Sequence, residues 1–189
     1  MDLLLQSFDN AELAWQQAIL ELGWGHGVVA VAYFGVAWLC WLGGHVADNA
    51  RETSRPWHVA AILICLMGIN AILHGDVWVA ELFRSMAKLE GWYDTRREMQ
   101  YQLLTGLAVL GLLVAGWLFS YFDTFDESFK LVLLGLLILL MLALLRAVSA
   151  HQADVVLNLS LAGLSIARLL ELGGIGLVAS GTWRYLRVR

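Results

Sequence analysis

Long apolar segments alternate with short polar ones along most of the chain. A helix that spans a bilayer needs about 20 mostly apolar residues. Five segments approach this length, and we predict membrane spans at residues 24–43, 57–75, 101–122, 131–148 and 155–182. The fifth segment carries Arg168 and Glu171 near its middle, and charged residues are costly at membrane depth. A four-span arrangement, in which this segment is only half-inserted, is therefore the alternative.

Two further segments have apolar residues on one helical face and polar residues on the other. The clearer case is residues 77–90, and the second is residues 10–22, which follow Asp9 and Glu12 at the spacing of a capping box. Helices of this kind lie in the plane of the membrane interface. We predict one or two interfacial helices from these segments.

These patterns predict an all-α integral membrane helix bundle that forms one transmembrane domain over residues 1–189. The composition agrees, because 60% of the residues are hydrophobic and 15% are charged, against about 45–50% and 25% in soluble domains. A formal net charge of −4 provides no basic surface for nucleic acid. The N-terminus has neither a basic region nor a cleavage pattern, so we expect no cleaved signal peptide.

The lysine and arginine residues are divided almost evenly between the two membrane sides. The first side holds the N-terminus, the segment before the third span and the loop after the fourth, with five basic residues. The second side holds the other loops and the C-terminus, with six. The basic residues of the C-terminal tail, Arg184, Arg187 and Arg189, have no acidic neighbours, which favours a cytoplasmic C-terminus.

Imidazoles and carboxylates gather at the first side when the helices fold antiparallel. The residues that would meet there are His26, His74, Asp76, His151 and Asp154. This set suits zinc, iron or copper, and haem ligated by two histidines is a related alternative. None of these residues has a dedicated metal-binding spacing, and the plainer interpretation is a group of interfacial side chains.

A second histidine pair is expected at the other end of the first two spans. His45 and His58 should meet on the second side together with Asp48, because the two helices run antiparallel.

Polar residues within the spans form another candidate site. Arg168 and Glu171 are three apart on one helix and could pair directly. The pair either anchors the fifth span or forms a proton or ligand site in which Glu171 titrates. Asn70 belongs with them, because an amide inside a span commonly bonds across helices.

A polar cap is expected on the first side, formed by Arg96, Arg97, Arg146 and Asp154. These arginines could bind an anionic headgroup or pair with nearby carboxylates such as Asp154. We favour the second interpretation, a salt-bridged cap that closes the bundle.

Two motifs carry a resemblance to a known family. They are the G-W-Y-x-x-R-R-x-x-Q stretch at residues 91–100 and the R-A-x-S-x-H-x-x-D stretch at residues 146–154. With them, residues 57–180 resemble an uncharacterised family of small bacterial polytopic inner-membrane proteins. Members often carry a second histidine where this chain has Gln152. The resemblance implies a bacterial inner membrane and no particular reaction.

The sequence favours a protein that packs with others over one that catalyses. Small residues at the spacing that lets helices approach closely occur at Gly111 and Ala115 and at Gly163 and Ala167, and no catalytic motif stands out. We expect a non-catalytic membrane subunit or accessory protein that contacts lipid and other membrane proteins or its own copies. The alternatives are a redox protein or enzyme that binds metal or haem through the first-side histidines, and a small transporter or proton-conducting subunit.

Overall fold

The computed structural model describes residues 2–20, 24–89, 125–148 and 164–189, with residues 160–161 and scattered helical positions between 102 and 116. The described part is almost entirely helical, which confirms the predicted all-α class. The elements are α1 (Asp2–Leu20), α2 (Trp24–Asn49), α3 (Arg55–Leu73), α4 (Gly75–Leu89), α6 (Glu127–Val148), β1 (Ser160–Leu161), β2 (Leu164–Ser165) and α8 (Ile166–Val188).

Three helices of the described part are long and apolar enough to cross a membrane. They are Gly27–Asn49 within α2, Arg55–Leu73, which is α3, and Glu127–Arg146 within α6. These helices correspond to the first, second and fourth predicted spans, and they make a membrane protein the consistent interpretation of the chain. The third predicted span, residues 101–122, lies mostly outside the described residues.

Helix α8 begins later than the fifth predicted span. The short antiparallel hairpin of β1 and β2 occupies the start of that segment, and the helix begins only at Ile166. Ser165 caps it, because its side chain accepts a hydrogen bond of 3.3 Å from the backbone N–H of Arg168. Such a cap satisfies an otherwise unpaired donor at the helix start. The continuous span predicted from Val155 is therefore interrupted where the hairpin lies.

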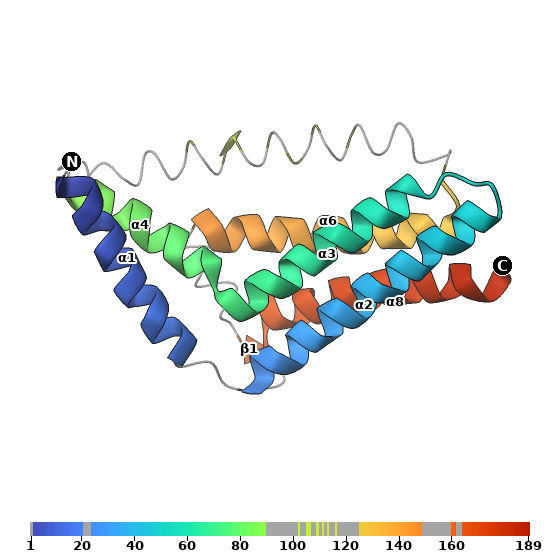
Figure 1. The fold of residues 1–189 in the computed structure, drawn as a ribbon, viewed down its shortest axis with the longest axis horizontal. Helices are drawn as coiled ribbons and strands as arrows, with labels where there is room; N and C mark the ends of the chain where they lie inside the picture. The colour runs from blue at the N-terminus through green and yellow to red at the C-terminus, as the bar shows by residue number, and fades with distance from the viewer. Residues whose placement is uncertain are drawn as a thin grey trace.

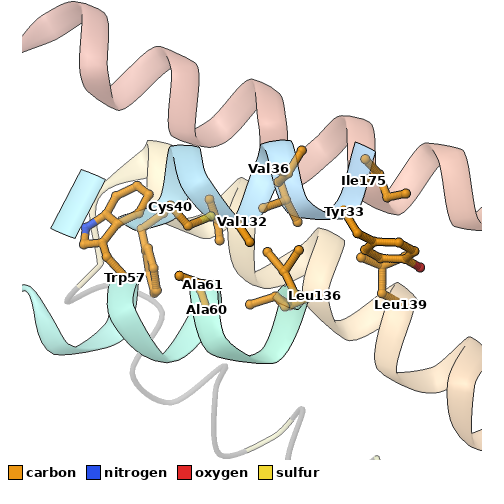
Figure 2. Packing of buried hydrophobic residues seen from close by; sticks show 14 of the residues in the cluster. Tyr33, Val36, Cys40, Trp57, Ala60, Ala61, Val132, Leu136, Leu139 and Ile175 are labelled. Carbon is orange, nitrogen blue, oxygen red and sulfur yellow. The ribbon is translucent and has the colours of Figure 1, made fainter. Parts of the chain in front are cut away.

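Helices α2, α3, α6 and α8 form a bundle (Figure 1). Helix α3 packs along α2, α8 packs along α6, and contacts between α2 and α8 join the two pairs. Figure 2 shows how the core draws on all four helices, with Cys40 from α2, Trp57 from α3, Val132 from α6 and Ile175 from α8. Burial of these side chains between the helices excludes lipid from the centre of the bundle.

The loop between α2 and α3 meets the end of α8 and the start of α6. The Trp57 ring lies 4.9 Å from that of Phe129 and 4.5 Å from that of Tyr185. The Tyr185 hydroxyl donates a 2.9 Å hydrogen bond to Glu52, and Arg189 forms an ion pair with the same carboxylate. These contacts bring together the three segments that we assigned to the second side.

Helix α2 ends in a turn that reverses the chain into α3. The backbone N–H of Arg51 donates to the carbonyl of Asp48 at 3.0 Å, and that of Glu52 donates to the carbonyl of Ala47 at 2.9 Å. This is the Schellman pattern, in which the residue after the helix adopts a left-handed conformation. Arg51 does so, with φ 58°. The turn thereby fixes Glu52 where it meets Tyr185.

Helices α1 and α4 pack on each other beside the bundle, and we call them the α1–α4 arm (Figure 1). Ser7 and Ala11 of α1 are buried, as is Ser85 of α4, whose hydroxyl accepts a 3.0 Å hydrogen bond from Asn10. Helix α1 begins at Asp2 and continues through Asp9, so the predicted capping box does not start this helix. The α4 helix occupies the segment predicted as residues 77–90.

Candidate functional site: an ion cluster beside a cavity

Glu171 is a buried carboxylate near the start of α8, with 5% of its side chain exposed. Arg146, in the last turn of α6, donates to both of its oxygens, at 3.4 and 3.2 Å. The Arg168 guanidinium lies 3.6 Å from Glu171, so the pair predicted from their spacing is present. Two arginines from two helices therefore share one carboxylate.

Tyr33 of α2 is the fourth member of this group. Its hydroxyl donates a 3.1 Å hydrogen bond to Glu171, and its ring is buried beside Leu139 and Ile175 (Figure 2). We call Tyr33, Arg146, Arg168 and Glu171 the Glu171 cluster. It connects α2, α6 and α8 through a single side chain. Because it contains two guanidiniums and one carboxylate, the cluster carries a net charge of +1.

A cavity of about 240 Å³ lies beside the cluster, bounded by α2, α3, α6 and α8. Its lining is largely apolar, with polar groups from a few positions. The lining residues are Tyr33, Leu63, Leu66, Met67, Asn70, Ala71, Leu139, Leu140, Leu142, Ala143, Arg146 and Glu171. A mostly apolar cavity with a small number of polar groups is typical of ligand sites.

Arg146 has a partner inside the bundle that we did not expect, and the polar cap itself stays a prediction. The polar-cap prediction paired it with loop carboxylates such as Asp154, whereas the structure pairs it with Glu171 inside the bundle. The reason is the antiparallel packing of α6 on α8, which places the end of the first beside the start of the second. Arg96, Arg97 and Asp154 lie outside the described residues.

The residues of the predicted metal site are only partly described. His26 lies in the first turn of α2, and Asp76 lies in the first turn of α4. His74 joins α3 to α4 with a left-handed φ of 47°. His151 and Asp154 lie outside the described residues. Within the described ranges, no three or more histidine, cysteine or acidic side chains come together, and the first-side metal site stays a prediction.

The second histidine pair is confirmed. The rings of His45 and His58 lie 5.8 Å apart, and Trp41 packs edge-on against His58 at 4.7 Å. The His58 ring also packs directly on Gly44. A methyl group at Gly44 would lie 2.6 Å from the Nε2 atom of His58, so the contact requires glycine. The pair thus belongs to an aromatic contact that holds α2 against α3.

Two parts of the site were missed or only partly foreseen from the sequence. Tyr33 gave no signal beyond a single hydroxyl in an apolar span. Asn70 was singled out as an amide in a span, and the structure places it in the cavity wall. A cavity depends on how four helices meet, which no local pattern encodes.

Comparison of the chain with known protein families, curated proteins and solved structures gives no match.

Proposed function

We propose that this chain is a non-catalytic multi-pass subunit of the bacterial cytoplasmic membrane that packs with other membrane proteins. The observation that carries the proposal is the α1–α4 arm. Its small residues and the rings of Phe8 and Trp78 form the contact between the two helices, whereas several leucines of α1 are exposed. Among the described residues of α1, Leu5 is 58% exposed, Leu13 60% and Leu20 85%.

The arm is suited to the membrane interface and to a protein partner there. Its apolar residues are interleaved with polar ones such as Asp9, Glu12 and Gln16, so α1 is too polar to span. The face of α1 opposite Ser7 and Ala11 is exposed and mixes leucines with these polar residues, so α1 has a second surface to offer after it has packed on α4. Exposed apolar surface of this kind marks membrane or protein contact.

Site-specific photocrosslinking tests this proposal. A photoreactive phenylalanine analogue is placed at Leu5 or Leu13 on the arm, and at Val59 on the outer face of α3 as the control, in native membranes. We expect a protein adduct of one defined mass from the arm positions and lipid adducts from Val59. Lipid adducts alone from the arm would contradict an accessory role.

We further propose five spans with the C-terminus in the cytoplasm. In support, the 23 residues of α8 correspond to about 35 Å of helix, enough to cross a hydrocarbon core of about 30 Å. The exposed Arg184 and Arg187 near its end fit the rule that basic residues remain inside. The resemblance of the two sequence motifs supports the bacterial inner membrane.

A small transporter or proton-conducting subunit is the second candidate, and the cavity beside the Glu171 cluster favours it. Glu171 is paired with both Arg146 and Arg168. Proton transfer through its carboxylate therefore requires these ion pairs to break. Reconstituted vesicles with a pH-sensitive dye test this function. Proton flux that is lost in Glu171→Gln and kept in Glu81→Gln, a change on the arm, would support it. Equal flux in both variants and in empty vesicles would exclude it.

A further inference from the structure

The cavity beside the Glu171 cluster has a charged end and an apolar end, and we propose that it binds a single-chain anionic amphiphile. The polar groups lie at matching positions on two helices that end together. Asn70 is near the end of α3 and Arg146 is near the end of α6, while Leu63 and Leu139 lie two helical turns deeper. Two turns correspond to about 10 Å. A headgroup at the helix ends and an alkyl chain pointing into the bundle match this order.

The charge of the cluster selects an anion. Arg146 and Arg168 together carry two positive charges, and Glu171 is the one acidic side chain among the described residues that pairs with them. An excess of charge at membrane depth is costly. A guanidinium has five N–H donors, and the hydrogen bonds of Arg146 to Glu171 use two of them. Its side chain is 36% exposed and lines the cavity. The remaining donors can bind a carboxylate or phosphate, whose geometry matches the guanidinium fork.

The size of the cavity suits a ligand with one chain. A volume of about 240 Å³ equals about eight water molecules at roughly 30 Å³ each. This space accommodates a small headgroup and part of one alkyl chain, and it is open on one side, where Leu66 and Leu140 are exposed. A fatty carboxylate and a single-chain lipid phosphate share the required chemistry, and either source satisfies the site.

Native mass spectrometry of the full chain in an uncharged maltoside detergent tests the proposal. Decanoate and decyl phosphate should each bind with one molecule per chain. Decanol, which keeps the chain and lacks the charge, should bind about tenfold or more weakly, because a hydrogen bond to a charged group contributes about 1.5–3 kcal/mol. Acetate, which keeps the charge and lacks the chain, should not displace decanoate.

Variants of the lining residues test whether the ligand binds in the cavity. Ala143→Phe adds a ring to the lining without touching the charges and should abolish decanoate binding, whereas Leu134→Phe, at an exposed position of the same helix outside the cavity, should leave it unchanged. Arg146→Gln should weaken binding about tenfold or more. Its unfolding temperature is recorded alongside, and the Ala143 variant keeps the test valid if Arg146→Gln does not fold.

Three results of the binding experiments would overturn the proposal. They are equal binding of decanol and decanoate, displacement of decanoate by acetate, and unchanged binding in Ala143→Phe. The mass of any molecule that decanoate displaces from freshly purified protein identifies the source. A fatty acid mass points to a free carboxylate and a lysophospholipid mass to a membrane lipid, both within the proposal. A two-chain phospholipid mass contradicts it.

Discussion

The carboxylate of Glu171 is surrounded by groups that require its charge. Arg146 donates two hydrogen bonds to it, Arg168 lies within ion-pair distance and Tyr33 donates a third hydrogen bond. A buried ion pair is weak evidence of net stability, but removal of one partner is strongly destabilising because it leaves a buried charge uncompensated. The stability of the fold should therefore fall more when one member of an ion pair in the cluster is replaced than when both members are replaced.

Replacement of Arg146 with Ala should lower the free energy of unfolding by about 3 kcal/mol. This is the low end of the range of about 3–5 kcal/mol for broken buried pairs, because Arg168 stays beside Glu171. Thermal and denaturant unfolding in detergent measure the change. The matched control is Arg84→Ala, which removes an exposed pair with Glu81 and should cost less than about 1 kcal/mol. Only partial recovery of stability is expected in Arg146→Ala combined with Glu171→Leu, because Arg168 and the buried Tyr33 hydroxyl then lose their acceptor. Equal losses in the single and double variants would argue against the pairing.

Tyr185 gives the structure a dependence on alkaline pH. Burial, aided by the hydrogen bond to Glu52 and by the charge of that carboxylate, raises the pKa of its hydroxyl to about 12, from about 10 in the unfolded chain. A raised pKa stabilises the fold below pH 10, and this contribution is lost as the pH rises towards 12.

The Tyr185→Phe variant isolates this contribution, because it keeps the ring against Trp57 and removes the hydroxyl. We expect the variant to be less stable than the native chain by about 1 kcal/mol at pH 8. The difference should shrink between pH 10 and 12. Unfolding temperatures measured across this range decide the matter, and a difference that stays constant would show that the hydroxyl does not titrate with folding.

At the scale of elements, the close approach of α6 and α8 depends on glycines. A methyl group at Gly181 would lie 2.5 Å from the carbonyl oxygen of Ser128, and one at Gly135 would lie 2.6 Å from that of Gly174. Small residues let helix backbones come into direct contact in membranes. Neither clash is with a flexible side chain end, so the helices themselves would have to separate.

Gly181→Ala should therefore destabilise the protein by about 1–3 kcal/mol, the usual cost of overpacking. Gly176 is on the same helix, and a methyl group there meets nothing within 4 Å. Gly176→Ala should leave stability unchanged or raise it by up to about 1 kcal/mol, because alanine favours the helix. The pair is compared by unfolding in detergent. A loss in both variants would indicate a general intolerance of α8 to alanine, not a local contact.

The elements themselves were largely predictable from the sequence, and their contacts were not. Runs of apolar residues located α2, α3 and α6, because a bilayer imposes both length and composition on a helix. The start of α8 was misplaced, since Leu161 and Leu164 of the hairpin continue the apolar pattern of the segment. The small-residue pairs singled out from the sequence included Gly163, which lies outside the described residues, whereas Gly135 and Gly181 make the close contacts.

In the candidate site, too, some residues could be predicted from the sequence and their tertiary contacts could not. Arg168 and Glu171 were recognisable because charge inside an apolar segment is rare, and their spacing predicted the pair. Tyr33 and Arg146 joined them only through tertiary packing, across 138 and 25 residues of chain. Sequence reasoning assigned Arg146 to a surface cap because its own helix ends there. Its partner depends on which helix packs beside it.

At the scale of the whole molecule, the contacts predict which segments face the same side of a membrane. In a chain with Cys40 and Cys65 replaced by alanine, single cysteines are introduced at Glu127, Arg187 and Leu20. A membrane-impermeant maleimide applied to sealed vesicles should label the first two from one side and Leu20 from the other. Labelling of Glu127 and Arg187 from opposite sides would show that α8 does not span.

The shared carboxylate of α8 also bears on how the chain enters the membrane during synthesis. Arg146 emerges from the ribosome before Glu171, and each charge alone disfavours insertion of its helix. Glu171 has Arg168 beside it on its own helix, whereas the charge of Arg146 is compensated by Glu171 only when α8 is present. Helix α8 is not among the described helices apolar enough to qualify as spans by themselves. We therefore expect α6 and α8 to enter the bilayer as one antiparallel unit. Helix α8 would then insert by pairing with α6, which is synthesised earlier. If translation is halted before Glu171, α6 should be less firmly inserted in the membrane.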